Sequence, residues 1–495
     1  MSHNKYYIAI DLGAESGRVM IGTISDGTLS LSEVHRFPNG PVEEDNTIRW
    51  DIENTFGEIK KGLKKAIDDC PATPMGIGID AWGVDYGLID AQGKLVEKPF
   101  HYRDSRTDEM MDACFKKVPK RHVYDETGIQ FMQPNTIFQL LAARQSNDDA
   151  LSKATSLLFI PDLITFFLSG HRQAEYTIAS TSGLLNPTTR QWHKALFSKL
   201  DLPINIMPEI IMPGKTTCKL SDALCTEFNC EPIDIITTGC HDTANAVASV
   251  PVKNNDSWAY LSSGTWSLVG IETDEPIINN TTYDDQFTNE GGVEGKIRLL
   301  KNLMGLWILQ ECRRQWQRDG VTLDYTTITK MAADAVAFEG IINPNNASFF
   351  APGDMPARVN DYLSKTGQTS TDDKGQICRI ILESLALKYR WTIEKLEKLS
   401  GKPIDTLHIV GGGTQNKLLN QFAANAINRK VVTGPIEATA CGNILMQAIA
   451  TKTVSSLAEG RKLIGNSFEV ETYLPDDAQT WNDAYTKATS LFNQD

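Results

Sequence analysis

Asp11 stands where a short apolar stretch runs into a glycine turn. Residues 8–10 predict a buried strand, and Gly13 and Gly17 lie in the turn that follows. Glycine turns let backbone N–H groups approach phosphate oxygens without interference from a Cβ atom. A carboxylate beside such a turn can hold Mg²⁺ through its water shell, because this ion binds few carboxylates and keeps several waters. The same residues also suit an ordinary β-hairpin, with glycine at the bend and Asp11 as a turn former.

A triple glycine at residues 411–413 forms a second candidate phosphate or nucleoside site. It follows a strand-like stretch at 407–410 and precedes a helical pattern whose N-cap we expect near Thr414 or Asn416. Glycines at a helix N-terminus leave the backbone open to an anion. A triple glycine alone is weak evidence for a nucleotide site. It becomes stronger evidence when it is considered together with the turn at Asp11.

Two familiar phosphate motifs are not present. The stretch PGKTT at 213–217 would need a glycine five positions before Gly214 to form a P-loop, but Glu209 stands there. The stretch GIGIDA at 76–81 resembles a dinucleotide fingerprint. It is followed by the strand-like residues 84–89 rather than by a helix, so the sequence argues against this type of site.

Strand-like and helical patterns alternate along the chain, which predicts an α/β fold. The clearest helical pattern has apolar or aromatic residues at every third or fourth position from Ile377 to Leu396, and Gly401 follows as a C-terminal stop. Two strand–turn units also resemble each other, one near residue 9 and one near residue 260. The second reads YLSSGTWSLVG.

A chain of 495 residues is too long for one ordinary core and predicts two domains. We expect domains at 1–250 and 251–495, joined by the polar, proline-led segment 251–256. A second polar, strand-poor segment at 353–375 is expected to be an excursion within the second domain.

The composition limits the possible partners. The formal net charge is −14, which argues against a broad nucleic-acid or anionic-membrane surface. The first residues contain no apolar signal core and no stretch reaches transmembrane length, so we expect no membrane partner. Nine scattered cysteines without a CxxC pair predict reduced thiols in a cytoplasmic protein. No segment suggests self-association, and a monomer is expected.

Taken in order, three segments resemble those of the actin/hexokinase/Hsp70 ATPase superfamily: DLGAESG, YLSSGTWSL and IVGGGTQN. Further motifs resemble the FGGY carbohydrate kinases, and within them the subfamily of L-rhamnulose kinases. They are IDAWGVDYGLID, YRDSRT, TGCHDTANAV, TNEGGVEGKIRLLKNLMGLWILQ and FFAPGDMP. The resemblance extends from about residue 6 to about residue 450.

The resemblance implies two ribonuclease-H-like domains with a catalytic cleft between them. It also implies an enzyme that uses ATP and Mg²⁺ to phosphorylate O1 of L-rhamnulose, in L-rhamnose catabolism. Another ketose, such as L-fuculose or a pentulose, is the alternative substrate. A nucleotide-switched partner protein like actin or Hsp70 is a more distant alternative, because such a protein needs no sugar site.

By the same resemblance, Asp242 is the general base, since it matches the family's aspartate in the segment TGCHDTANAV. An aspartate just before a helix could also be its N-cap. The residues expected to contact the sugar are Gly83, His241, Asp242, Thr243 and Asn302. Asp11 is expected to hold Mg²⁺ through water.

The resemblance places ATP against Ala14, Glu15, Ser16, Gly17, Arg18, Thr265, Gln310 and Gly412. These kinases usually carry Thr or Ser where this chain has Ala14 and Glu15, so we expect Glu15 to point to solvent. Arg18 could pair with phosphate or be merely exposed. Asn302 and Gln310 are eight positions apart, which predicts that they share one face of a single helix.

Overall fold

The computed structural model describes residues 4–146, 149–253 and 256–493. The chain forms two compact units, and each is made of several segments. Unit 1 comprises Met1–Asn254, Glu272–Leu299 and Ala438–Phe468, and unit 2 comprises Asn255–Ile271, Leu300–Glu437 and Glu469–Asp495. Of the expected linker at 251–256, residues 254 and 255 lie outside the described part of the chain.

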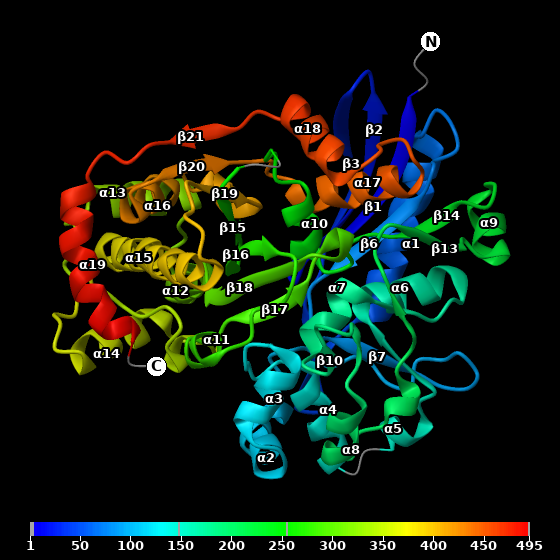
Figure 1. The fold of residues 1–495 in the computed structure, drawn as a ribbon, viewed down its shortest axis with the longest axis horizontal. Coiled ribbons are helices and arrows are strands. Elements are labelled where there is room, and N and C mark those ends of the chain that lie inside the picture. Colours follow the sequence, from blue (N-terminus) through cyan, green and yellow to red (C-terminus); the bar gives the residue numbers. More distant parts are fainter. Residues whose placement is uncertain (1–3, 147–148, 254–255, 494–495) are drawn as a thin grey trace. The chain divides into compact units, whose positions relative to one another are not determined.

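The sheet of unit 1 has the strand order β13-β14-β6-β1-β2-β3 (Figure 1). Its strands are β1 (Lys5–Leu12), β2 (Ser16–Ser25), β3 (Thr28–Pro38), β6 (Ile77–Ala81), β13 (Lys215–Lys219) and β14 (Asp234–Thr237). Strands β1, β6 and β14 are parallel, whereas β2 runs antiparallel to both β1 and β3. The carboxyl ends of β1 and β6 therefore lie at the same edge of the sheet.

Helices cover both faces of this sheet, and alternate residues of β1 pack against them. Ile8 and Ile10 lie in a core cluster with residues of α1 (Ile52–Asp69) and α6 (Ile160–Ser169). Tyr7 and Ala9 lie in another cluster with residues of α17 (Ala438–Ala450) and α18 (Leu457–Ser467). A strand buried on both faces has no polar side, which explains why the sequence of β1 is continuously apolar up to Asp11.

The rest of unit 1 consists of shorter elements. The helices are α2 (Met110–Lys117), α3 (Lys120–Thr127), α4 (Thr136–Gln145), α5 (Ala150–Lys153), α7 (Tyr176–Ala179), α8 (Lys194–Leu200), α9 (Asp222–Phe228), α10 (Asp242–Ala248) and α11 (Asn280–Asp284). The strands are β4 (Pro41–Glu44), β5 (Thr47–Trp50), β7 (Tyr86–Ile89), β8 (Ser156–Phe159), β9 (Ala174–Glu175), β10 (Leu185–Asn186), β11 (Gln191–Trp192), β12 (Ile210–Ile211) and β17 (Thr288–Gly291).

The second sheet has the order β17-β18-β16-β15-β19-β20-β21, and most of it belongs to unit 2. Its further strands are β15 (Trp258–Ser263), β16 (Trp266–Thr273), β18 (Ile297–Met304), β19 (Thr406–Val410), β20 (Lys430–Thr433) and β21 (Glu471–Tyr473). The run β18-β16-β15-β19-β20 repeats the connection order of β3-β2-β1-β6-β14. The two strand–turn units that resemble each other in sequence, β1–β2 and β15–β16, are the antiparallel pairs that begin the two sheets.

Six helices complete unit 2: α12 (Trp307–Arg318), α13 (Tyr325–Asp334), α14 (Met355–Lys365), α15 (Lys374–Ser400), α16 (Lys417–Ile427) and α19 (Ala478–Phe492). Helix α15 confirms the predicted apolar stripe, and Gly401 ends it in the left-handed conformation with φ 67°. Glycine adopts this φ without the strain that a Cβ brings. None of the helices within the described ranges is long and apolar enough to cross a membrane.

Candidate active site

Three carboxyl groups of unit 1 lie at or next to the ends of parallel strands. Asp11 near the end of β1 and Asp80 near the end of β6 are partners in the strand register. Ala81 forms a parallel bridge with His241, the residue directly before Asp242. Burial raises the pKa of Asp80 well above its usual range, and the charges of Asp11 and Asp242 raise it further. The three carboxyl groups are therefore electrostatic neighbours.

Asp80 is a site residue that the sequence reasoning missed. It is fully buried, and its Oδ2 accepts hydrogen bonds from the side-chain amides of Asn443 (2.6 Å) and Asn245 (3.1 Å). Its Oδ1 has no hydrogen-bond partner among the described residues. A signal was present, since Ile-X-Ile-Asp occurs twice, at 8–11 and at 77–80. Two parallel strands with the same pattern bring their aspartates to one edge of the sheet.

The turn after β1 contains Gly13, as predicted, and is held by Asn39, whereas Gly17, also expected in the turn, already lies in β2 and pairs with Leu12. The Gly13 N–H donates to the Ser16 carbonyl (2.9 Å), while Asn39 donates to the carbonyls of Gly13 (2.7 Å) and Glu15 (3.1 Å). These carbonyl oxygens are thereby satisfied within the protein. The Glu15 side chain is exposed, which confirms the expectation that it points to solvent.

Arg18 pairs with Asp11 through a hydrogen-bonded ion pair. The two residues face each other across the β1–β2 register, and both side chains are largely buried. Arg18 is therefore not simply a solvent-exposed arginine at the start of a strand. The pair places a guanidinium next to the turn that follows β1.

Asp242 is the first residue of α10, and His241 is the N-cap. The alternative reading of Asp242 as the N-cap is therefore wrong, although its Oδ1 accepts from the N–H and Oγ1 of Thr243. The side chain of Asp242 is 33% exposed. Desolvation raises the pKa of Asp242 above its ordinary value, His241 opposes this shift, and the charge of Asp11 adds to it. A raised pKa makes a carboxylate a better proton acceptor.

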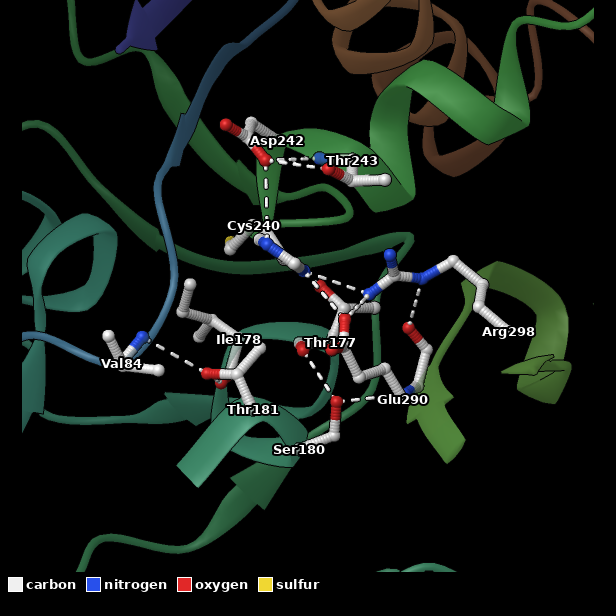
Figure 2. A network of polar contacts seen from close by, with 12 residues as sticks. Val84, Thr177, Ile178, Ser180, Thr181, Cys240, Asp242, Thr243, Glu290 and Arg298 are labelled. Atoms are coloured by element: carbon white, nitrogen blue, oxygen red, sulfur yellow. Dashed lines mark hydrogen bonds and ion pairs between the residues drawn. The ribbon is translucent and has the colours of Figure 1, made fainter. Parts of the chain in front are cut away.

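The backbone before Asp242 is held by Glu175 of β9 and by Thr177 of α7; Figure 2 shows Thr177 beside Cys240 and Asp242. Glu175 Oε2 accepts from the Cys240 N–H (3.2 Å), and Thr177 Oγ1 accepts from the His241 N–H (3.1 Å). Thr181 Oγ1 accepts from the Val84 N–H (3.1 Å). A Cβ at Gly83 would lie 3.2 Å from the Thr181 side chain, so the expected sugar contact Gly83 is closely packed.

In unit 2 the expected nucleotide residues lie on adjoining segments. The Trp307 N–H donates to the Thr265 carbonyl (3.1 Å), so the β15–β16 turn is bonded to the start of α12, which carries Gln310. A Cβ at Gly413 would lie 1.9 Å from Ser263 Oγ, whereas a Cβ at Gly412 would meet nothing within 4 Å. Gly413 thus packs against the end of β15, whereas there is open space next to Gly412.

Two polar atoms of this region fit the binding of a nucleotide. Gln310 Oε1 and Ser263 Oγ are buried, and neither has a hydrogen-bond partner in the part of the chain that the structure describes. A buried polar atom without a partner costs about 1–3 kcal/mol, which a ligand that supplies the partner would recover. The helix after the glycines begins at Lys417 with Asn416 as its N-cap, one of the two predicted positions.

The prediction that Asn302 and Gln310 share one helix is wrong. Asn302 lies on β18, and Gln310 lies on α12, which begins only at Trp307. The eight-residue spacing fits two helical turns. In the structure, however, residues 297–304 form a strand with buried residues on both faces. Its polar residues Arg298, Lys301 and Asn302 have the i, i+3, i+4 spacing that is typical of a helix, so periodicity did not indicate a strand.

Family models match nearly the whole chain. The N-terminal domain model of the FGGY family of carbohydrate kinases matches residues 6–248, and the C-terminal domain model matches residues 259–451. The chain belongs to the FGGY family of carbohydrate kinases. This family-wide relationship confirms the resemblance on which the site residues were chosen.

Relatives within the family are similar over almost their full length. A rhamnulokinase of Bacteroides thetaiotaomicron is 42% identical over 479 residues, which cover 97% of this chain and 98% of that protein. A rhamnulokinase of Oceanobacillus iheyensis is 37% identical over 470 residues, covering 94% and 97%. The crystal structure of a ligand-bound xylulose kinase from Lactobacillus acidophilus is 17% identical and covers 99% of this chain and 98% of that chain, with a TM-score of 0.81. This FGGY kinase therefore has the predicted α/β fold of the family.

We expect Glu175 to make the free energy of unfolding of this FGGY kinase dependent on pH. Burial raises the pKa of Glu175 from 4.5 to about 7. Between these values the folded chain binds more protons than the unfolded chain, so the free energy of unfolding falls as the pH rises. Between pH 4.5 and pH 7.5 we expect Glu175 to lower it by up to about 3 kcal/mol. Buried Asp85, whose pKa is raised to about 6, acts in the same direction.

Urea unfolding at several pH values measures this effect. In Glu175→Gln the carboxyl group no longer titrates while an amide oxygen remains to accept the N–H groups of Ile178 and Cys240. The fall of the urea midpoint between pH 5 and pH 7.5 should be smaller in this variant than in the wild type. An identical slope in both proteins would contradict the role given to Glu175.

Proposed function

We propose that this chain is an ATP-dependent kinase that phosphorylates O1 of L-rhamnulose and yields L-rhamnulose 1-phosphate and ADP. The observation that carries the proposal is Asp242, a partly exposed carboxylate at the start of α10 with a raised pKa. The substrate is proposed from the relatives named rhamnulokinase, which are 37–42% identical over nearly the full chain.

In the proposed reaction Asp242 accepts the proton of the O1 hydroxyl as O1 bonds to the γ-phosphorus of ATP. The bond from this phosphorus to the bridging β–γ oxygen breaks, and ADP leaves. Little covalent work falls to the protein in phosphoryl transfer, so positioning and charge stabilisation dominate. We propose that Gly83, His241, Thr243 and Asn302 orient the sugar.

We propose that ATP is bound by Ala14, Glu15, Ser16, Gly17, Arg18, Thr265, Gln310 and Gly412, the residues that match the family's motifs. The backbone of the first turn, rather than the exposed Glu15 side chain, would contact the phosphates. Bound Mg²⁺ supplies charge that neutralises the phosphate oxygens, and Asp11 would hold it through water. Because Asp11 also pairs with Arg18, both members of this ion pair would lie next to the bound ion and the phosphates.

A substrate panel tests the function. ADP release is measured with L-rhamnulose, L-fuculose, L-ribulose, D-xylulose and no sugar, and the sugars are ranked by kcat/KM. We expect release to require sugar and kcat/KM to be at least ~10-fold higher for L-rhamnulose, because a hydrogen-bonding site rejects misplaced hydroxyls. Preference for another ketose would assign the alternative substrate. ATP turnover indifferent to every sugar would overturn the proposal in favour of a nucleotide switch.

We also propose that the kinase works as a monomer in the cytoplasm, on a small ketose and ATP, with neither nucleic acid nor membrane as partner. All nine cysteines are free thiols, which suits a reducing compartment. The net charge of −14 disfavours anionic polymers and surfaces. We propose a domain division at 1–250 and 251–495, which is supported by family models that match residues 6–248 and 259–451.

A further inference from the structure

Arg298 is a fully buried arginine that neither the sequence reasoning nor the proposed reaction uses. It lies near the start of β18, and its guanidinium reaches three groups (Figure 2). Its Nη2 donates to His241 Nδ1 (2.8 Å) and to Glu290 Oε2 (3.1 Å), and its Nε donates to the Gly291 carbonyl (2.8 Å). The stretch IRLLKNLM also contains Lys301 and Asn302, so its sequence did not single out Arg298.

The contact between Arg298 and His241 decides where the imidazole carries its proton. A guanidinium has only donors and does not lose its proton in proteins. His241 Nδ1 must therefore accept, which leaves the proton of the neutral ring on Nε2. Glu290 Oε2 is also 3.4 Å from His241 Nδ1 and would favour a proton there, but Arg298 is closer and neutralises this carboxylate.

His241 Nε2 faces the proposed base. It lies 3.5 Å from Asp242 Oδ1, the same oxygen that accepts from the N–H and Oγ1 of Thr243. Within the described residues, these contacts all fall on Oδ1. The other oxygen, Oδ2, is then the one that can take a proton from a substrate hydroxyl.

We propose that Arg298, with Glu290, is a positioning residue that holds His241 in the Nε2–H tautomer and thereby fixes the orientation of the Asp242 carboxylate. This inference rests on the proposed function, in which Asp242 is the base. A carboxylate fixed through Oδ1 presents Oδ2 in one orientation, and such preorganisation lowers the barrier to proton transfer.

The energetics of the site argue against a role in stability alone. Arg298 Nη1 is buried and has no hydrogen-bond partner within residues 4–146, 149–253 and 256–493, which costs free energy. A buried ion pair often contributes no more to stability than apolar residues of the same volume. The main chain at residues 240 and 241 is held separately, by Glu175 and Thr177. Loss of Arg298 should therefore act on the ring of His241 rather than on the loop that carries it.

The tautomer can be measured directly in the wild-type protein. Nitrogen-15 NMR of protein labelled at histidine distinguishes protonated from unprotonated ring nitrogens, and the His241→Asn variant assigns the signal. We expect His241 to carry a proton on Nε2 and none on Nδ1. A proton on Nδ1 would overturn the proposal. This readout needs no activity, so it stands even if the substrate panel rejects the proposed function.

Variants at Arg298 test the consequence. In Arg298→Met the Glu290 carboxylate is left without the guanidinium, so we expect a proton on His241 Nδ1 and a fall of ~10-fold or more in kcat, with a smaller change in KM. Arg298→Lys keeps a donor and should retain the tautomer and most of kcat. A wild-type tautomer and kcat in Arg298→Met would overturn the proposal. If this variant does not fold, Arg298→Lys and the wild-type spectrum decide.

A matched control removes another buried arginine–carboxylate pair. Arg379 Nε is 2.7 Å from Glu383 Oε1 in α15 of unit 2, and no histidine is among its hydrogen-bond partners in the described chain. Arg379→Met should lower stability and leave the His241 signal unchanged. If it shifts the His241 signal as Arg298→Met does, the effect is general destabilisation and the proposal fails.

Discussion

Asp242→Asn is expected to lower kcat by ~10²-fold or more, the usual range for a positioned general base. Asparagine keeps the shape and can still accept from Thr243, but it cannot take up the hydroxyl proton. Since the substitution removes no packing, we expect KM to change by a much smaller factor than kcat. The melting temperature should stay close to that of the wild type. Steady-state kinetics of ADP release at saturating ATP and sugar measure the effect.

Asp222→Asn is the matched control for this substitution. Asp222 is the first residue of α9, as Asp242 is of α10, and both carboxylates follow the N-cap residue. Both variants remove a negative charge from a helix N-terminus, which costs about 0.3–1 kcal/mol. Only Asp242→Asn should lose activity. If Asp242→Asn kept kcat within roughly threefold of the wild-type value, the assignment of Asp242 as the base would fail.

Gly442→Ala is expected to destabilise unit 1 by about 3 kcal/mol or more, the upper range for overpacking. A Cβ on Gly442 of α17 would lie 1.8 Å from the backbone carbonyl oxygen of Asn245 on α10. Backbone inside a helix cannot move aside as a flexible side chain can. Helix α10 also begins with Asp242, so the same shift should disturb the base. Thermal unfolding followed by circular dichroism measures the loss.

Gly57→Ala provides the control within the same unit. Gly57 lies in the middle of α1, and a Cβ there would meet nothing within 4 Å. Alanine is favoured over glycine in a helix by up to about 1 kcal/mol, so this variant should be as stable as wild type or more so. If Gly442→Ala had the same melting temperature as the wild type, α10 and α17 would not approach each other as closely as described.

Patterns that act over a few residues were predicted well. The apolar run ending at Asp11, the helix ending at Gly401 and the N-cap at Asn416 all formed as expected. The exposure of Glu15 also followed from local chemistry, since a carboxylate facing a triphosphate would be repelled. At Asn302 the prediction was wrong, because the polar residues of the buried strand at 297–304 happen to have helical spacing.

The sequence by itself determined the family, the α/β class and the residues that the family's motifs mark. Only the tertiary structure decided their partners. Asp80 receives an amide of Asn443 from 363 residues away, and His241 receives the guanidinium of Arg298 from 57 residues away. The physical reason is that a hydrogen bond between distant segments leaves no periodic trace in either one. It forms only when the packing of sheets and helices brings the two segments together.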